Sequence, residues 1–89
     1  MPIALIARDN PDSLQIRMDT RPAHLDYLKS TEAVMHAGPL LDADEKPCGS
    51  LIVLDTTMDE ARAWADADPY AAAGLFASVE LIAWNKVIG

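Results

Sequence analysis

The chain has 89 residues, a formal net charge of −7 and a single cysteine, Cys48. Hydrophobic residues make up 51% of it, which excludes the composition of an intrinsically disordered protein. The acidic balance argues against a surface for nucleic acid or for an anionic membrane, because both need a basic patch. A lone cysteine forms no intrachain disulfide, and no leader or membrane-length apolar run is visible. We therefore expect a cytoplasmic protein.

The length predicts a single domain over residues 1–89. A core of this size is marginal on its own, so self-association is a reasonable expectation.

The N-terminal part predicts one strand and one helix. Residues 2–7 are almost continuously apolar, as in a strand that is covered on both faces. Residues 8–13 form a polar turn, and residues 14–18 are irregular or a helical lead-in. Asp19 or Thr20 can cap a helix that has Pro22 in its first turn and ends near residue 31.

The middle of the chain predicts a hairpin. Residues 33–37 form the second strand, which Gly38 and Pro39 end. A charged, solvated loop over residues 40–47 leads to a third apolar strand at residues 49–54. The short connection favours antiparallel pairing of these two strands.

The C-terminal part begins with the capping box formed by Thr57 and Glu60. In the helix that follows, the apolar stripe Ala61, Trp64, Ala65 ends at Asp68. Pro69 ends this helix, residues 70–73 form one more turn, and residues 78–84 form the fourth strand.

This order predicts an α+β fold of the ferredoxin-like βαββαβ type, with a four-stranded antiparallel sheet and both helices on one face. No element of the chain remains to cover the other face, yet the strands are apolar on both sides. We therefore expect a homodimer in which two sheets pack face to face.

Two polar residues are candidates for chemistry. His24 borders the core-facing stripe near the start of the first helix, and Asp68 lies at the end of the second. If the helices pack side by side, the two ends can meet, and the carboxylate would orient the imidazole for proton transfer. Simpler alternatives are an ordinary helix histidine for His24 and a pure N-cap for Asp68.

The other reactive side chains suggest no further site. His36 fits a sheet or interface residue, and Cys48 fits a small loop residue. No spacing of ligands indicates a metal site, and Gly38 and Gly49 lack the strand–loop–helix context of phosphate-binding loops. We expect neither a metal nor a cofactor.

Several blocks of the sequence resemble the YciI-like (YCII-related) family. They are Arg-Pro-Ala-His-Leu at 21–25, Ala-Gly-Pro at 37–39, Gly-Ser at 49–50, Ala-Trp-Ala-Asp-Ala-Asp-Pro-Tyr at 63–70 and Ala-Gly at 73–74. The resemblance implies a dimeric α+β barrel with a His–Asp pair, which maps to His24 and Asp68. It also implies kinship with dehydrochlorinases of chlorinated hydroxyquinones, in which the histidine is the proposed acid–base.

The resulting hypothesis is a cofactor-independent acid–base enzyme (isomerase, lyase or dehydrochlorinase) acting on a small cyclic or aromatic metabolite. His24 would move the proton, and Asp68 would orient the His24 imidazole. Arg21 and Ser50 are candidates for holding a polar or anionic group, and Gly38 for close backbone approach to the ligand. The alternatives are a non-catalytic dimeric module that binds a small molecule and a purely structural role for Asp68.

Overall fold

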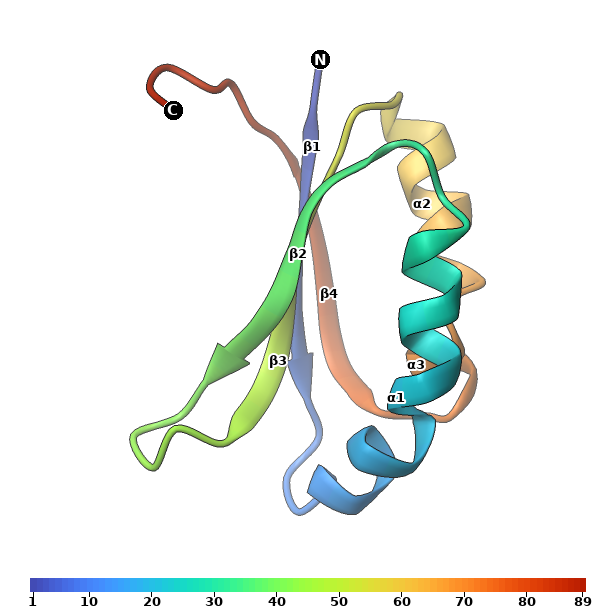
Figure 1. Cartoon of the computed structure of the whole chain (residues 1–89), viewed down its shortest axis with the longest axis vertical. Coiled ribbons are helices and arrows are strands. Elements are labelled where there is room, and N and C mark those ends of the chain that lie inside the picture. Colours follow the sequence, from blue (N-terminus) through green and yellow to red (C-terminus); the bar gives the residue numbers. More distant parts are fainter.

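The computed structural model describes all residues, 1–89. Its elements in chain order are β1 (Ile3–Asp9), α1 (Leu14–Lys29), β2 (Val34–Leu41), β3 (Pro47–Leu54), α2 (Met58–Asp66), α3 (Pro69–Ala72) and β4 (Phe76–Ala83). The four strands form one antiparallel sheet in the order β2-β3-β1-β4, and the helices lie together on one face of it (Figure 1). The predicted ferredoxin-like α+β fold is confirmed.

The first helix starts earlier than the capping pattern predicts. It begins at Leu14, and Pro22 lies in its interior. Asp19 does not cap it; its carboxylate accepts a hydrogen bond from Gln15 one turn earlier, at 2.7 Å. The first turn is held against the sheet because Arg17 forms an ion pair with Asp9 at the end of β1. A tertiary contact therefore outweighs the helix-breaking preference of a proline.

The second strand runs through the Gly38-Pro39 pair instead of ending there. The sheet order puts β2 at an edge, where a residue without an N–H is tolerated. Pro39 is in register with Ser50 of β3. The loop is correspondingly shorter than predicted, and the Asp42 carboxylate closes it by accepting the backbone N–H groups of residues 44 and 46.

The second helix is capped as predicted, since the Thr57 hydroxyl accepts the Glu60 N–H at 3.2 Å. The Glu60 carboxylate, however, bonds the Thr56 hydroxyl and does not reach back to the cap. The helix ends at Asp66, two residues before Asp68. Asp68 is instead the N-cap of the short helix α3.

The core lies between the helices and one face of the sheet. It consists of small and aliphatic side chains from β1, β3 and α2, namely Ile3, Leu5, Ala7, Ile52, Leu54, Ala61 and Ala65. The strand registers put Ile6, Leu51 and Ile82 on the opposite face, where Leu51 is 41% exposed and Ile82 is 50% exposed. This open face carries these apolar side chains together with Glu80, which is in register with Ile6, and no helix covers it.

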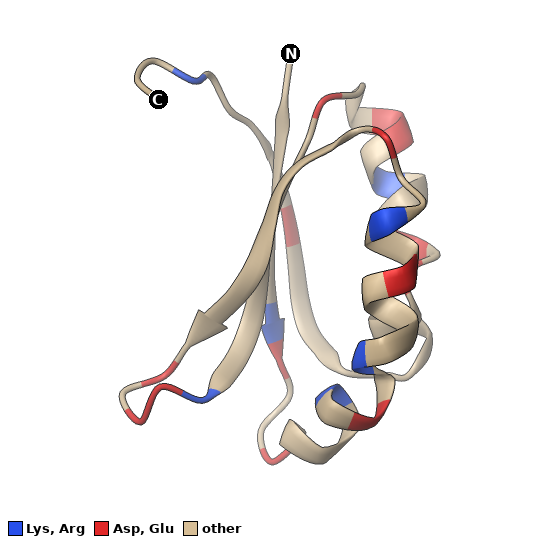
Figure 2. Cartoon of the chain, in the orientation of Figure 1, with Lys and Arg blue, Asp and Glu red and all other residues tan.

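Charged residues lie mainly on the helices and at the loop tips (Figure 2). Strands β2 and β3 contain no Lys, Arg, Asp or Glu. None of the helices is both long and apolar enough to cross a lipid bilayer.

Candidate functional site

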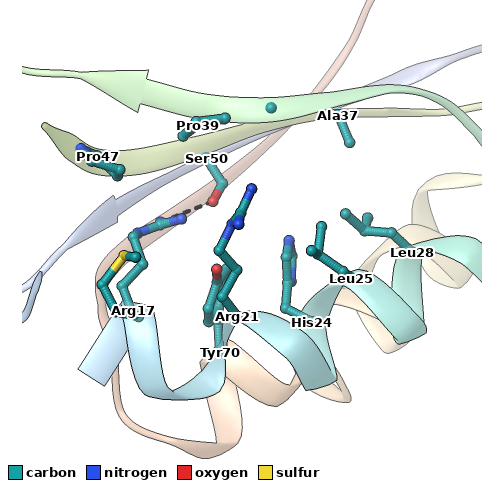
Figure 3. Close-up of a pocket in the computed structure, with 12 residues that line it drawn as sticks. Arg17, Arg21, His24, Leu25, Leu28, Ala37, Pro39, Pro47, Ser50 and Tyr70 are labelled. Carbon is teal, nitrogen blue, oxygen red and sulfur yellow. Dashed lines mark hydrogen bonds between the residues drawn. The ribbon is translucent and has the colours of Figure 1, made fainter. Parts of the chain in front are cut away.

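A cavity of about 330 Å³ opens between α1 and the β2–β3 hairpin (Figure 3). One helix face and two strands supply most of its walls, and α3 adds one aromatic ring. The lining residues are Arg17, Met18, Arg21, His24, Leu25, Leu28, Ala37, Gly38, Pro39, Pro47, Ser50 and Tyr70. Apolar walls with a few convergent polar groups are the usual composition of a small-molecule site.

His24 and Asp68 are in direct contact beside this cavity. His24 Nδ1 lies 2.9 Å from Asp68 Oδ1, and the two residues are only 6% and 1% exposed. An ionised carboxylate only accepts hydrogen bonds, so Nδ1 carries the proton that it donates. The other ring nitrogen, Nε2, is then an acceptor on the cavity side of the ring (Figure 3).

The local sequence explains why Asp68 is held so rigidly. Pro69 opens α3 with a residue that needs no N–H partner, and Asp68 Oδ1 accepts the Tyr70 N–H at 2.9 Å. The same oxygen thus serves both the helix cap and His24. Asp68 Oδ2 is buried and has no hydrogen-bond partner among the protein groups. A buried carboxylate in this position can stabilise an imidazolium that forms beside it during proton transfer.

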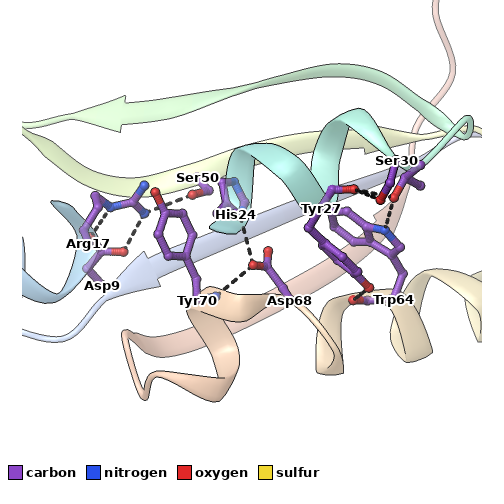
Figure 4. A network of polar contacts seen from close by, with 10 residues as sticks. Asp9, Arg17, His24, Tyr27, Ser30, Ser50, Trp64, Asp68 and Tyr70 are labelled. Atoms are coloured by element: carbon purple, nitrogen blue, oxygen red, sulfur yellow. Dashed lines mark hydrogen bonds and ion pairs between the residues drawn. The ribbon is translucent and has the colours of Figure 1, made fainter. Parts of the chain in front are cut away.

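The Tyr70 ring is enclosed between His24 and Arg17. The imidazole stacks on the phenol with ring centroids 3.9 Å apart and an interplanar angle of 20°. The Arg17 guanidinium lies 4.6 Å from the Tyr70 ring centroid, on the side away from His24 (Figure 4). The edge of Phe76 also contacts the ring. These contacts define the orientation of the imidazole as well as that of the phenol.

The cavity carries two guanidinium groups with different environments. Arg17 is buried, and its Nε and one terminal nitrogen donate to the two Asp9 oxygens at 2.7 and 2.8 Å. The latter nitrogen also donates to Ser50 Oγ at 2.9 Å. Burial alone would lower the pKa of Arg17, but the hydrogen bond and charge of Asp9 outweigh it, and the pKa is raised. Arg21 is exposed and has no carboxylate within ion-pair distance.

The cavity is therefore locally cationic, although the chain is acidic overall. Arg17 is neutralised by Asp9, whereas the charge of Arg21 is free to meet a ligand. Such a lining favours anions or polar groups that develop negative charge.

The residues predicted for substrate contact all line the cavity, but in different ways. Arg21 presents its guanidinium, and Ser50 presents a hydroxyl that already accepts from Arg17. Gly38 contributes backbone only, because its register with Leu51 puts any Cβ on the open face of the sheet. His36 shares that open face, outside the cavity.

Sequence reasoning missed Arg17 and Tyr70 as members of the site. The signal for Arg17 is helical spacing, since residues 17, 21, 24 and 28 recur on one face of α1. The prediction of an irregular segment or helical lead-in at residues 14–18 conceals that spacing, because these residues in fact form the first turns of α1. Tyr70 directly follows the Asp-Pro pair, and its burial follows from the capping contact of its own N–H with Asp68.

A second, smaller cavity of about 200 Å³ lies beside Trp64. Next to this cavity, a network of hydrogen bonds connects α1 with α2 (Figure 4). The Tyr27 hydroxyl donates to the Trp64 carbonyl, and Trp64 Nε1 donates to Thr31 Oγ1, both at 2.8 Å. These contacts satisfy their own members and join α1 to α2, so we assign this network a structural role. No three His, Cys, Asp or Glu side chains gather as a metal site would require.

The sequence matches the model of the YCII-related domain over residues 1–85. The chain is 36% identical over 93 residues to Protein YciI of Escherichia coli, covering 93% of this chain and 95% of that protein. It is 34% identical over 94 residues to an uncharacterised protein of Haemophilus influenzae, with the same coverages.

Solved structures agree with this assignment. 5-Chloro-2-hydroxyhydroquinone dehydrochlorinase (TftG) of Burkholderia phenoliruptrix, in complex with 2,5-dihydroxybenzoquinone, superposes with a TM-score of 0.89. It is 34% identical, and the match covers 96% of this chain and 94% of that one. A Mycobacterium tuberculosis protein at 13% identity and a TM-score of 0.66 shares the fold alone. On sequence and structure together, the chain belongs to the YCII-related family.

Proposed function

We propose that this protein is an acid–base enzyme that moves a proton on a small cyclic metabolite, with His24 as the base. The observation that carries the proposal is the orientation of His24. Its Nδ1 is bound to the buried Asp68 at 2.9 Å, while the ring lines a cavity that can hold a small molecule.

The pair supports a simple proton cycle. Neutral His24 takes a proton from a substrate C–H or O–H through Nε2, and the resulting imidazolium is stabilised by the adjacent Asp68 carboxylate. The same nitrogen then returns the proton elsewhere on the substrate, in an isomerisation, or loses it to solvent after a leaving group departs. No serine or cysteine nucleophile contacts His24, so proton transfer is favoured over acyl transfer.

The substrate class follows from the charge of the cavity. Arg21 has no protein carboxylate partner, and Arg17 with Ser50 provides a second polar wall. These groups suit a planar ring that bears acidic hydroxyl or carbonyl oxygens. The dehydrochlorinase TftG acts on a chlorinated hydroxyhydroquinone and was solved with a dihydroxybenzoquinone. We propose a ligand of this hydroxyquinone type for the present chain, including a dehydrochlorination as one candidate reaction.

A homodimer is part of the same proposal. The open sheet face carries Ile6, Leu51 and Ile82 on three adjacent strands, with Leu51 opposite Ile6 and Ile82 opposite Ala4, and two of these side chains are exposed in the single chain. Packing against a second copy would bury them. We also propose a cytoplasmic location, which the single cysteine supports.

The alternative is a non-catalytic module that binds the same class of molecule. Its support is the same cationic cavity, and it differs in requiring no proton transfer by His24.

The experiment is a screen of wild type, His24→Ala and His36→Ala against enolisable cyclic compounds, including 5-chloro-2-hydroxyhydroquinone. His36→Ala is the matched control, because His36 lies outside the cavity. We expect turnover by wild type and by His36→Ala, and a loss of about 10²–10⁴-fold in His24→Ala. Ligand-dependent melting shifts with no turnover in any protein would favour the binding module.

A further inference from the structure

We propose that the Tyr70 hydroxyl is a second catalytic group, which donates a hydrogen bond to the substrate oxygen on which negative charge develops. This inference rests on the proposed function of the His24 site and adds the electrophilic partner that a base needs.

The position of Tyr70 is fixed on several sides. Its N–H is bound to Asp68, its ring stacks on His24 at 3.9 Å, and Arg17 and Phe76 contact the remaining ring surface. The residue is only 1% exposed. It nevertheless lines the cavity, with the hydroxyl end of the ring directed toward the strands that form the opposite wall (Figure 3).

The proton of this hydroxyl is available to a ligand. No hydrogen bond runs from this hydroxyl to a protein acceptor: Tyr70 donates through its backbone N–H to Asp68 Oδ1, and the guanidinium of Arg17 beside the phenol can only donate. Burial raises the pKa of the Tyr70 phenol; the charges of Arg17 and Arg21 act against this effect, Asp68 adds to it, and the pKa stays above its ordinary value. The phenol is thus a neutral donor at physiological pH.

The chemistry needs both groups on one substrate. When His24 Nε2 removes a proton from a carbon next to a carbonyl, as in the keto tautomer of a hydroxyhydroquinone, the electron pair of the C–H bond moves to the carbonyl oxygen. A preorganised donor at that oxygen stabilises the enolate as it forms. The near-parallel stack brings the imidazole and the phenol to the same cavity, and no oxidant, reductant or metal enters the step. The Arg17 guanidinium beside the phenol ring stabilises the hydrogen-bonded anion further.

The test is the pair Tyr70→Phe and Tyr27→Phe. Each removes one phenol hydroxyl and keeps the ring, and Tyr27 is the matched control because its hydroxyl donates to the Trp64 carbonyl outside the cavity. With 5-chloro-2-hydroxyhydroquinone, we expect kcat of Tyr70→Phe to fall about 10²–10³-fold and that of Tyr27→Phe to stay within about twofold.

A second readout does not depend on turnover. The chain has two tyrosines, so Tyr27→Phe labelled with [¹³Cζ]tyrosine gives one signal, from Tyr70. Addition of 2,5-dihydroxybenzoquinone to the labelled Tyr27→Phe protein should shift this signal. In a separate binding measurement, Tyr70→Phe should bind the quinone about tenfold more weakly than wild type.

The outcomes separate this inference from the function on which it rests. Loss of activity in His24→Ala, together with wild-type kcat and quinone affinity in Tyr70→Phe, would overturn the role of Tyr70 alone. Wild-type activity in His24→Ala would instead remove the proposed function. An unshifted Tyr70 signal at saturating quinone also contradicts the inference, because the hydroxyl would then not touch the ligand.

Discussion

His24 and Tyr70 are stacked at 3.9 Å and donate to the same carboxylate oxygen, one through its ring Nδ1 and the other through its backbone N–H. That oxygen belongs to Asp68, the N-cap of α3. The start of a four-residue helix therefore fixes the imidazole, the phenol and the charge between them. The local turn that ends the α2 segment is also the support of the candidate site.

Asp68→Asn should separate the capping role from the electrostatic role. The amide oxygen can still accept the Tyr70 N–H, so α3 keeps its cap, but the negative charge beside His24 is lost. We expect a loss of activity of about 10²–10⁴-fold with a stability cost of about 1–3 kcal/mol from the new buried amide group. Enzyme assays and urea unfolding measure the two effects.

Thr57→Ala is the matched control for this prediction, since Thr57 caps α2 away from the cavity. It should cost about 1 kcal/mol and leave activity unchanged. If Asp68→Asn behaves like this control, with full activity, Asp68 is only a cap.

Arg17→Met should reduce the stability of the protein, whereas Arg21→Met should leave the stability almost unchanged. Removal of Arg17 leaves the Asp9 carboxylate, whose side chain is 7% exposed, without its partner, so we expect a loss of about 3–5 kcal/mol of unfolding free energy. Arg21 is exposed and unpaired, so its removal should change stability by less than about 0.5 kcal/mol.

Binding of 2,5-dihydroxybenzoquinone provides the complementary readout for Arg21. Its loss removes the free cation of the cavity, and we expect affinity to fall about tenfold. Equal affinity of wild type and Arg21→Met would show that the ligand does not pair with this guanidinium.

Stability should decline at alkaline pH because of the tyrosines. Burial first, and the charge of Asp68 in addition, raise the pKa of Tyr27 above its ordinary value of 10.0, and the pKa of Tyr70 is also raised. At a pH above the tyrosine pKa of the unfolded chain, the unfolded chain releases phenol protons that the folded chain retains. The free energy of unfolding therefore falls as pH rises. The stabilisation from these two tyrosines is complete below their pKa in the unfolded chain. It is lost as the pH rises through their higher pKa values in the folded protein.

Urea unfolding from about pH 8 to about pH 11 measures this slope. The variant Tyr27→Phe/Tyr70→Phe should show a shallower decline than wild type. Parallel curves for the two proteins would mean that other groups cause the alkaline loss.

Leu51→Lys should disrupt the proposed dimer. Leu51 is 41% exposed on the open sheet face, so a lysine there costs the single chain little but puts a charge into a sheet-to-sheet interface. We expect wild type to sediment as a dimer and Leu51→Lys as a monomer with retained secondary structure. A wild type that sediments as a monomer at all accessible concentrations contradicts the dimer.

The fold is predictable from the sequence because its determinants are local. Apolar runs define the strands, and the Thr57 cap and the Asp68-Pro69 pair define the second helix and its end. The predicted element boundaries are wrong where contacts between residues distant in sequence determine where an element begins or ends. The start of α1 depends on an ion pair between Arg17 and Asp9, and β2 passes through its proline because it lies at a sheet edge, which only the strand order reveals.

In the candidate site, too, some residues could be predicted from the sequence and others could not. The sequence predicts that His24 and Asp68 meet because it places them at the start of one helix and the end of another. The two side chains do lie 2.9 Å apart, but His24 is in the interior of α1 and Asp68 is the N-cap of α3. Tyr70 and Arg17 could not be placed in advance, since an aromatic ring and a buried guanidinium gain their roles from neighbours distant in sequence. Their stack appears only when α1 and α3 are docked.

The most direct test of the account is chloride release from 5-chloro-2-hydroxyhydroquinone by wild type, His24→Ala and His36→Ala. Loss of HCl from this compound needs one proton removed and one chloride expelled, with no external oxidant. The account predicts chloride release by wild type and His36→Ala, and a rate about 10²–10⁴-fold lower for His24→Ala. Equal rates for wild type and His24→Ala would contradict it.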